Sequence, residues 1–430
     1  MTSFFPDGGT LTEIAGQPIT ELAGRFGTPL YVYDAAKIVV RLAQLKSFDV
    51  IRFAQKACSN IAISDLVRRH GGFIDCVSGG EIHRALAAGF NPGQDMHPPQ
   101  VVYTADIFDR ESLEFVERHD IHVNCGSPDM IDQYGERCPG KSITLRINPG
   151  FGHGHSQKTN TGGSQSKHGI WHEQLADCVT RAKKCNLTVS GLHMHIGSGS
   201  DLEHLSQVCS ALEKSALVIG PTLRSISAGG GLPIDYHAGR ELIDAQAYFD
   251  LWNATRRRLA DKFGHAISLE VEPGRFLVAE SGYLISEIRA IKTAGENEFY
   301  LVDAGFNNLA RPILYGAYHP MAICPASSKS AGGKQPAKRD VVVGGPLCES
   351  GDIFTQQEGG FVTRRSLPAA QIGDYLVFGI AGAYGYVMAS NYNSKPLVAE
   401  VLIENGQANL IRARQTLDDV IRGEAIPRRS

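Results

Sequence analysis

The chain has 430 residues, 43% of them hydrophobic, so it is too long for one typical domain and apolar enough to bury two cores. Its 42 basic and 45 acidic residues give no indication of a surface for nucleic acid or an anionic membrane. The chain shows neither a signal peptide nor an apolar run approaching the roughly 20 residues of a membrane helix. Nine cysteines without C-x-x-C spacing favour reduced thiols over disulfides or a metal cluster. We therefore expect a cytoplasmic protein whose partners are small molecules or a second copy of itself.

Between about residues 50 and 272, short apolar or β-branched runs alternate with longer amphipathic stretches, a pattern typical of βα units around a parallel sheet. Eight strands are expected, at 50–56, 73–77, 101–105, 121–125, 142–148, 189–195, 224–228 and 267–272. Helices are expected between them, for example at SDLVRRH and over 243–262. This alternation predicts a (β/α)8 TIM-type barrel over residues 31–283, with a Rossmann-like open sheet as the alternative.

Beyond Arg275 the helical pattern stops, and β-type runs separated by turn residues replace it. These runs are EFYLVDA, DVVVGG, GFVTRRSL, DYLVFG and VAEVLIENG. They predict a second, mostly antiparallel β domain over 284–430, which residues 1–30 cross over to complete. The Ser/Gly/Lys-rich segment 327–339 is typical of an exposed loop, and we assign it no function.

Several polar residues and glycines fall where a βα-barrel carries its chemistry, at the carboxyl ends of the strands. Three of them end or nearly end the first, second and sixth strands, and two groups follow the seventh and eighth. They are Lys56, Asp75 and His195, then Gly229, Gly230 and Gly231, then Glu272, Gly274 and Arg275. We expect this set to gather on one rim of the barrel.

Each rim residue also has an ordinary structural interpretation. Lys56 could simply be solvated, but small neighbours after an apolar run favour a desolvated amine that can form a Schiff base. The glycines at 229–231 could form only a turn, or backbone amides facing a phosphate. His195 could be a core histidine, or it could lie flat against an aromatic cofactor. Glu272 could form a surface pair with Arg275 worth at most ~1 kcal/mol, or it could keep a pyridine nitrogen protonated.

Eight motifs, spread in order over nearly the whole chain, resemble those of bacterial diaminopimelate decarboxylases. They are FAQKACSN, DCVSGGE, HMHIGSGS, AGGGL, EPGRFLV, FNNLARPILYGAYH, GGPLCESGD and GAYGYVMASNYN. This family belongs to the alanine-racemase-like (fold type III) group of pyridoxal-phosphate enzymes, which also includes ornithine decarboxylase. The resemblance implies decarboxylation of meso-2,6-diaminopimelate to L-lysine and carbon dioxide, the last step of bacterial lysine biosynthesis.

The resemblance also implies a role for each matching residue. Lys56 would bond to the cofactor, His195 would pack on its ring and Glu272 would contact the pyridine nitrogen, with Asp75 nearby. The phosphate would be surrounded by Ser198, Gly229, Gly230, Gly231, Gly274, Arg275 and Tyr384. The substrate would be held by Arg275, Arg311, Tyr315, Glu349 and Tyr384, with no metal.

Cys348 matches the acid that reprotonates the substrate carbon, which in the family arrives from the partner subunit of a homodimer. Arg311 with Tyr315 suits a second carboxylate, because arginine grips carboxylates bidentately. Without the resemblance, Arg311 could be an interface ion pair and Tyr315 a buried ring.

Two regions leave alternatives open. The segment 150–170 carries three histidines, but its glycine-rich spacing favours a flexible loop and not a metal site. In the family the equivalent stretch is a loop over the site that helps to recognise the substrate. Ahead of Tyr384, Ile380 and Ala381 replace a polar pair of many relatives. Two other functions also remain: decarboxylation of another basic or carboxylated amino acid, and a regulatory paralogue without turnover. Intact Lys56, Glu272 and Cys348 argue against the second.

Overall fold

The computed structural model describes residues 5–95, 97–152, 161–195, 202–237, 244–326, 337–357 and 359–428. The chain divides into two compact units, each described by itself below. The barrel unit comprises Ile38–Asp235 and Arg240–Leu277. The β unit comprises Met1–Lys37, Tyr236–Gly239 and Val278–Ser430.

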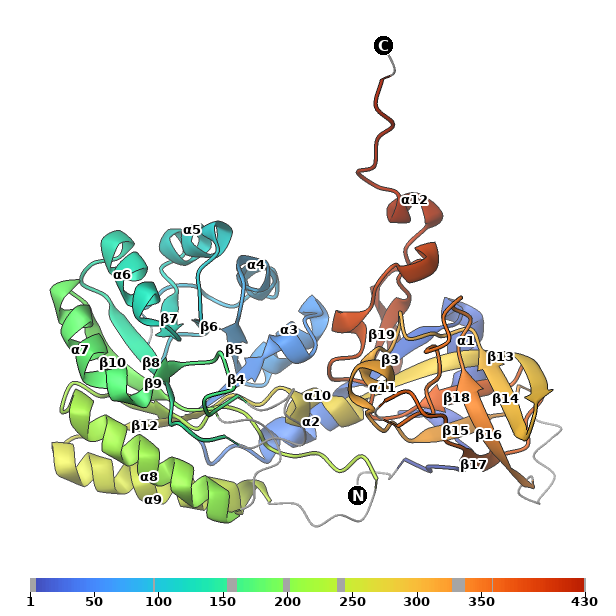
Figure 1. Cartoon of the computed structure of the whole chain (residues 1–430), viewed down its shortest axis with the longest axis horizontal. Helices are drawn as coiled ribbons and strands as arrows, with labels where there is room; N and C mark the ends of the chain where they lie inside the picture. Colours follow the sequence, from blue (N-terminus) through green and yellow to red (C-terminus); the bar gives the residue numbers. More distant parts are fainter. Residues whose placement is uncertain are drawn as a thin grey trace. The chain divides into compact units, whose positions relative to one another are not determined.

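The barrel unit is built on eight parallel strands, all at the positions expected from the sequence (Figure 1). They are β4 (Val50–Ala54), β5 (Phe73–Cys76), β6 (Val101–Ala105), β7 (His122–Cys125), β8 (Ser142–Asn148), β10 (Thr188–His193), β11 (Ser225–Ser227) and β12 (Ser268–Val271). Each strand pairs with the next, β8 pairs with β10, and β12 pairs back onto β4, so the sheet closes. The expected TIM-type barrel is confirmed, and the open sheet is excluded by that last pairing.

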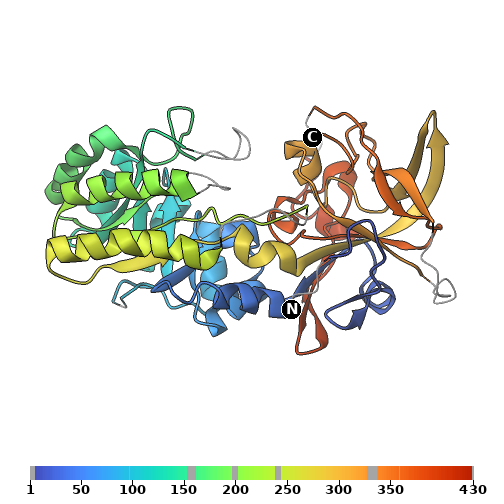
Figure 2. The same cartoon turned by 90° about the horizontal axis from the view of Figure 1, so that it is seen from below.

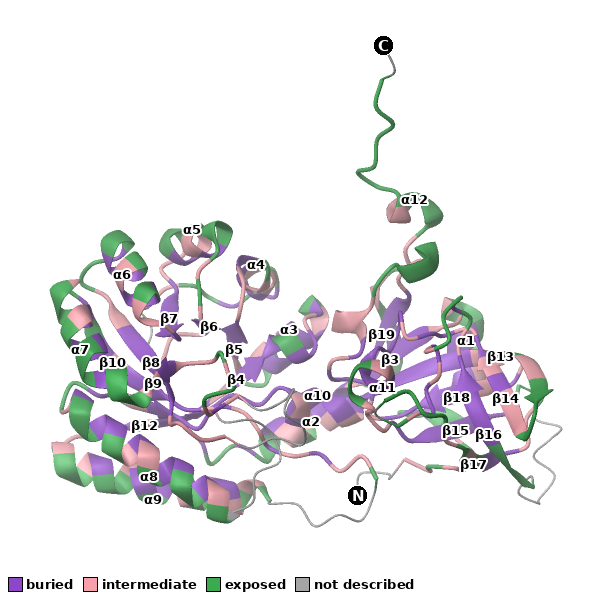
Figure 3. Ribbon diagram, viewed as in Figure 1, coloured by how far each residue is buried: buried purple, intermediate pink, exposed green. Residues whose placement is uncertain are grey.

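Helices follow most of these strands and cover the outside of the barrel. They are α3 (Ile61–Arg69), α4 (Gly79–Ala87), α5 (Arg110–Arg118), α6 (Pro128–Arg137), α7 (Leu175–Lys184), α8 (Leu202–Ile219) and α9 (Ala245–Phe263). The boundary between the two units falls within α2 (Ala35–Ala43) and α10 (Arg275–Val278). The long helices α8 and α9 lie side by side (Figure 2). Outward helix faces are exposed while the strands are buried (Figure 3). None of the described helices is long and apolar enough to cross a membrane.

Local sequence signals explain where several of these helices begin and end. The side chains of Asn60, Ser78, Asp109 and Asp244 accept a hydrogen bond from a backbone N–H of the first turn of α3, α4, α5 and α9. Such caps satisfy amides that have no partner within the helix. Gly264 ends α9 in the left-handed region at φ +74°, where a side chain would be strained.

A buried ion pair spans the strands that close the barrel. Arg52 on β4 donates to Glu270 on β12 through Nε at 2.6 Å and Nη2 at 3.2 Å. The Nη1 of Arg52 also donates to the carbonyl of Pro99 at 2.6 Å. Only 1% of Arg52 and 9% of Glu270 is exposed, so neither charge has water as an alternative partner.

The β unit is mostly antiparallel, as expected. Its strands are β1 (Glu13–Ile14), β2 (Gln17–Pro18), β3 (Leu30–Asp34), β13 (Gly282–Ala294), β14 (Asn297–Val302), β15 (Met321–Cys324), β16 (Lys338–Gly344), β17 (Arg365–Pro368), β18 (Tyr375–Phe378), β19 (Ala399–Glu404) and β20 (Gln407–Arg412). Its helices are α1 (Ile19–Phe26), α11 (Arg311–Tyr315) and α12 (Leu417–Val420). The exceptions to antiparallel pairing are β3 with β19 and β14 with β16.

The long strand β13 was not among the runs expected from the sequence. Its first half pairs with β3 and β18, and its second half forms a hairpin with β14. Along the strand the residues change from buried at Gly282 to exposed at Ala294. Charged residues in that exposed half interrupt the apolar run, which is why the sequence pattern did not reveal the strand.

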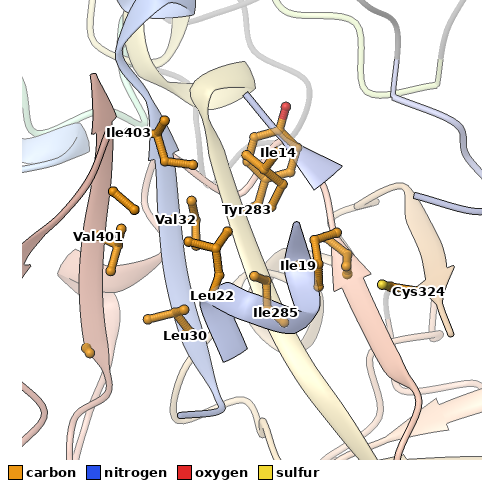
Figure 4. Close-up of a cluster of buried hydrophobic side chains, with 13 residues drawn as sticks. Ile14, Ile19, Leu22, Leu30, Val32, Tyr283, Ile285, Cys324, Val401 and Ile403 are labelled. Carbon is orange, nitrogen blue, oxygen red and sulfur yellow. The ribbon is translucent and has the colours of Figure 1, made fainter. Parts of the chain in front are cut away.

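The N-terminal segment completes the core of the β unit (Figure 4). Ile14, Ile19 and Leu22 pack with Leu30 and Val32 of β3. The same cluster includes Tyr283, Ile285, Cys324, Val377, Ala399, Val401, Ile403 and Ala408. These residues come from both ends of the chain, so burying their apolar surface joins the N-terminal segment to β13, β18 and β19.

Replacing Arg52 with Leu is expected to destabilise the barrel unit by about 3–5 kcal/mol, because Glu270 would keep a buried charge without its partner. Urea unfolding, followed through hydrogen exchange of the β4 and β12 amides, measures the change. The control is Arg258→Leu, which removes a pair with Glu213 that is 53% and 30% exposed. That pair should contribute about 0–1 kcal/mol. Equal losses in both variants would contradict a special role for the buried pair.

Candidate active site

The carboxyl ends of the barrel strands bring most of the expected rim residues together. Lys56 lies in a short 3-10 helix, Gln55–Ala57, directly after β4. Asp75 is the third residue of β5 and is 3% exposed, and Glu272 follows β12 and is 6% exposed. The Lys56 side chain is exposed, so the expected desolvation of its amine is not observed in the described chain.

Glu272 is the most firmly held of the rim carboxylates. His193 Nε2 lies 2.6 Å from Oε2, and the Ser227 hydroxyl donates to Oε1 at 3.0 Å. Burial alone would raise the pKa of Glu272, but the charge and hydrogen bond of His193, with contributions from His195 and Ser227, lower it to about 2. Glu272 is therefore a buried carboxylate that stays ionised at neutral pH.

Sequence reasoning missed His193, although it stands two residues before His195 in HMHIGSG. Residues two apart on a strand point to the same face, so either histidine of this motif could have been placed inside the barrel. His193 is 1% exposed, and its Nδ1 has no hydrogen-bond partner among the described residues. The Nε2 of His193 therefore carries the proton that faces Glu272.

His195 is held in a defined orientation. The amide of Gly230 donates to its Nδ1 at 3.1 Å, so in the neutral ring the proton is on Nε2. His195 as a whole residue is partly exposed, but burial of its ring, with the positive charges of Arg146 and Lys56, lowers the pKa of His195 well below its ordinary value. His195 is therefore a neutral, oriented ring at physiological pH. Arg146, which is buried on β8, was not expected from the sequence.

The glycines after β11 bring the backbone close to its neighbours. Gly229 has φ +62°, and a Cβ there would lie 2.7 Å from both the Cβ of His195 and the carbonyl of Met194. A Cβ on Gly230 would lie 2.7 Å from the carbonyl of Glu272. Larger residues would therefore push the chain after β11 away from His195 and Glu272.

Lys56 lies among acidic groups. Its positive charge opposes the raised pKa values of Asp75 and Glu81. Burial and the negative charge of Glu272 nevertheless raise the pKa of Asp75 well above its ordinary range, and its Oδ1 has no hydrogen-bond partner among the described residues. An unpartnered buried oxygen close to an exposed amine is typical of a site that a ligand completes.

Both ends of the segment after β8 are anchored in the barrel unit. Asn148, which is 4% exposed, accepts from the amides of Gly150 at 3.1 Å and Gly163 at 2.9 Å. It also donates to the carbonyl of Gly163 at 3.1 Å. The Thr161 hydroxyl donates to the carbonyl of His195 at 2.9 Å. Ser198 and most of the histidine-bearing part of 150–170 lie outside the described residues.

A second contact holds this region from the β6 side. His168 Nδ1 lies 2.5 Å from Asp106 Oδ2, and the amide of Gly169 donates to Oδ1 at 2.9 Å. Burial alone would raise the pKa of Asp106, but the hydrogen bond from His168 and the charge of Arg146 lower it. His168 therefore pairs with a carboxylate that is ionised at neutral pH.

Of the expected site residues not yet placed, Gly231, Gly274 and Arg275 belong to the barrel unit, and the others belong to the β unit. Arg311 and Tyr315 stand one turn apart on α11, where Arg311 is 7% and Tyr315 is 38% exposed. Cys348 and Glu349 are exposed after β16. All nine cysteines are free thiols, and Cys348 is the exposed one.

The segment around Cys348 has a fixed backbone. The amide of Cys348 donates to Asn393 Oδ1 at 2.8 Å. The buried Asp352 accepts from the amides of Leu347 at 2.8 Å and Phe306 at 2.7 Å. These bonds present an exposed thiol on a rigid loop. Asp352 closes the CESGD motif and was not expected to have a role.

Backbone strain marks the segment that contains Tyr384. Ile380 and Tyr384 have φ values of +53° and +56°. The left-handed region is costly for residues with a side chain, and most of all for β-branched ones. Ala381 between them is fully buried, and its amide donates to the carbonyl of Gly282 at 2.8 Å. Tyr384 is therefore held at the end of a tightly packed turn.

Comparisons with known proteins identify relatives of this chain. Residues 36–279 match the model of the pyridoxal-dependent decarboxylase family, pyridoxal binding domain. The diaminopimelate decarboxylase of Escherichia coli (strain K12) is 52% identical over 412 residues, which cover 96% of this chain and 97% of the relative. A crystal structure of diaminopimelate decarboxylase shares 52% identity with a TM-score of 0.90 and covers 94% and 95% of the two chains. The Helicobacter pylori enzyme, solved in complex with L-lysine, is 30% identical with a TM-score of 0.82 and covers 94% and 98%.

Replacing Asn148 with Ala is expected to speed hydrogen exchange of the Gly150 and Gly163 amides about tenfold, because both lose their acceptor. Asn148→Asp keeps an acceptor oxygen and should protect them better. Exchange measured by mass spectrometry on peptides covering these glycines tests this. Asn124→Ala is the control, since it removes a buried amide that bonds Thr104 instead. Similar exchange in all variants would show that Asn148 does not anchor the segment.

Proposed function

The chain belongs to the diaminopimelate decarboxylases of the pyridoxal-dependent decarboxylase family, and on that premise we propose how its residues perform the reaction. It decarboxylates meso-2,6-diaminopimelate to L-lysine and carbon dioxide. The observation that carries this function is the 52% identity over almost the full length of both chains. The resemblance seen in the sequence motifs is thereby confirmed.

The rim of the barrel unit fits pyridoxal phosphate. Glu272 is ionised and can hold a protonated pyridine nitrogen, while Lys56 offers an accessible amine. Gly229 and Gly230 have no Cβ that would clash with the backbone around His195 and Glu272, so the chain after β11 lies close to both residues. When bound, pyridoxal phosphate supplies an electron-accepting ring into which the electrons of the broken carbon–carboxylate bond are delocalised.

The chain's own residues then have distinct tasks. Lys56 would hold the cofactor through its amine. Glu272, held by His193 and Ser227, keeps the pyridine nitrogen protonated, so that the ring accepts electrons. His195, oriented by the amide of Gly230, would pack as a neutral ring on the cofactor.

Phosphate binding is assigned to backbone amides and a small set of side chains. The amides after β11 can donate to phosphate oxygens without a side chain in the way. The residues assigned to phosphate binding, through backbone or side chain, are Ser198, Gly229, Gly230, Gly231, Gly274, Arg275 and Tyr384. The strained turn that holds Tyr384 supports this assignment, because such strain persists where function requires a fixed position.

Substrate recognition depends on the end of the molecule that does not react. Meso-diaminopimelate carries a carboxylate and an ammonium at that end, whereas lysine or ornithine as substrate would carry only an ammonium there. Arg311 and Tyr315 bind the distal carboxylate, and Glu349 takes the ammonium. Arg275 and Tyr384 complete the contacts with substrate.

Reprotonation is assigned to Cys348, the exposed thiol of the chain. In the proposed homodimer, Cys348 comes from one subunit and Lys56 from the other. The rigid loop around Cys348 supports a role as a positioned proton donor, since general acid catalysis requires a defined approach to the carbon.

The function is tested by supplying meso-diaminopimelate, lysine, ornithine and arginine to the purified protein with pyridoxal phosphate. Carbon dioxide and L-lysine should form from the first substrate, and the other three should react poorly because they lack a distal carboxylate for Arg311. Lys56→Ala should abolish turnover. Borohydride reduction followed by peptide mapping should place the pyridoxyl label on Lys56. A label on another lysine, or equal rates with lysine, would overturn the assignment.

A shared site predicts complementation between two inactive variants. Cys348→Ala should lose about 10²–10⁴-fold in kcat while retaining the cofactor. Mixing it with Lys56→Ala, after dissociation and reassembly, should restore part of the activity, because a mixed dimer contains one site with both residues intact. Each variant reassembled alone is the control. No rescue, once mixed dimers are demonstrated, would mean that both residues come from one chain.

A further inference from the structure

Arg311 forms a hydrogen bond with a histidine, His319, to which no role has been assigned so far. The Arg311 side chain starts α11 and is 7% exposed, and its Nη1 lies 2.8 Å from Nε2 of His319. His319 is 1% exposed and immediately precedes Pro320 and β15. Its other ring nitrogen, Nδ1, lies 3.1 Å from the carbonyl oxygen of Gly379. The imidazole therefore bridges a guanidinium and a backbone carbonyl.

The two partners of His319 determine where its proton lies. A carbonyl oxygen can only accept, so Nδ1 of His319 carries the hydrogen. A guanidinium can only donate, so Nε2 carries the lone pair that accepts from Arg311. The ring is then neutral, and this contact orients the guanidinium without cancelling its charge. A carboxylate in the same place would compete with an anionic ligand for Arg311.

An aromatic ring fixes the guanidinium from another side. The Cζ of Arg311 lies 5.0 Å from the ring centroid of Tyr236, a cation–π distance. Tyr236 also meets the His319 ring edge to face, at 5.6 Å and 84°. Tyr236 belongs to the β unit, although Asp235 directly before it belongs to the barrel unit. Histidine and tyrosine together define both the position and the plane of the guanidinium.

The carbonyl that anchors His319 is itself immobile. The amide of Gly379 donates to the carbonyl of Pro320 at 2.8 Å, so residues 319–320 and 379 hold each other. A Cβ on Gly379 would lie 2.6 Å from the ring of Phe5, so a larger residue there would displace that ring. Gly379 directly precedes Ile380 and Ala381, the pair that departs from many relatives. The anchor of His319 is thus continuous with the strained turn that leads to Tyr384.

We propose that His319 is a positioning residue for substrate specificity, which aims the guanidinium of Arg311 at the distal carboxylate of the substrate. The inference rests on the proposed function, because it needs Arg311 to bind that carboxylate. A carboxylate is gripped strongly only when two parallel N–H donors meet both of its oxygens. An arginine side chain has several rotatable bonds, so fixing the plane of its guanidinium before binding lowers the entropic cost of that geometry.

Two substitutions separate the two hydrogen bonds of His319. Asparagine can place its amide nitrogen near the Nδ1 position and keep the bond to Gly379, but it does not replace the acceptor that His319 Nε2 offers to Arg311. Glutamine is longer and can place its carbonyl oxygen near the Nε2 position, where it accepts from Arg311. His319→Asn should raise KM for meso-diaminopimelate about tenfold, the effect of a lost hydrogen bond to a charged group, with a smaller change in kcat. His319→Gln should recover most of that loss.

Inhibition by two matched amines isolates the carboxylate. L-Lysine retains the carboxylate that Arg311 is proposed to bind, and cadaverine is the same diamine without it. In His319→Asn the inhibition constant of L-lysine should rise about tenfold, while that of cadaverine should stay within about twofold. A merely structural lesion would weaken both inhibitors alike. Tyr236→Leu removes the ring that lies against Arg311 and changes only a half-buried position. It should shift both inhibition constants in the same directions as His319→Asn, and it replaces that variant in the test if His319→Asn does not fold.

The outcomes distinguish this inference from the proposed function. If the wild-type protein releases no carbon dioxide from meso-diaminopimelate, the function itself fails. If the wild type is active but L-lysine and cadaverine weaken equally in the variants, His319 only supports the fold, and the inference is wrong. Equal KM values in wild type and His319→Asn would also overturn it. Selective loss of the carboxylate-bearing ligand, with recovery in His319→Gln, would establish it.

Discussion

Closure of the parallel sheet between β4 and β12 is the constraint on which the rim depends. Parallel strands all end on the same side, but eight of them surround a single site only when the first strand pairs with the last. Here the ladder between β4 and β12 is short, with Glu270 opposite Val50 and Val271 opposite Ile51. The Arg52–Glu270 pair and the bond from the Ala54 amide to the carbonyl of Pro273 at 3.2 Å reinforce it. Lys56 and Glu272 follow these two strands, so closure brings together residues distant in sequence.

The two buried carboxyl groups of the rim, Glu272 and Asp75, have pKa values shifted in opposite directions. His193 and Ser227 stabilise the ionised form of Glu272, whereas burial and Glu272 itself disfavour ionisation of Asp75. Two buried anions so close together would repel each other, and Lys56 compensates for only part of that repulsion. The consequence is a rim with one firmly ionised carboxylate, which suits a single protonated ring nitrogen. Its environment, and not the residue type, decides which carboxyl group takes that role.

The repeating helices and strands could be predicted from the sequence. The contacts that hold individual side chains in place could not be predicted from it. The alternation of apolar runs with amphipathic stretches predicts eight βα units. The order of the strands then places Lys56, Asp75 and Glu272 on the rim. The hydrogen-bond partners of those residues do not recur at a regular spacing in the sequence. His193 and Ser227 could be matched to Glu272 only once the barrel had closed, and Asn148 could be recognised as an anchor only once Gly150 and Gly163 were seen together. Tyr236 belongs to the β unit because its ring packs against Arg311 and His319, and these contacts could not be predicted from the sequence.

The position of β3 in its sheet has a consequence for the order in which the chain matures on the ribosome. β3 is made early, yet both of its neighbours come from far downstream, β13 on one side and β19 on the other. Translation delivers residues at about 5–20 per second, so all eight barrel strands emerge before either edge of β3 can be paired. The barrel unit can therefore mature while β3 still lacks its neighbours. Until Ala399–Glu404 has been synthesised, the nascent chain carries an apolar strand with an unpaired edge, a surface that chaperones recognise and that other nascent chains can join.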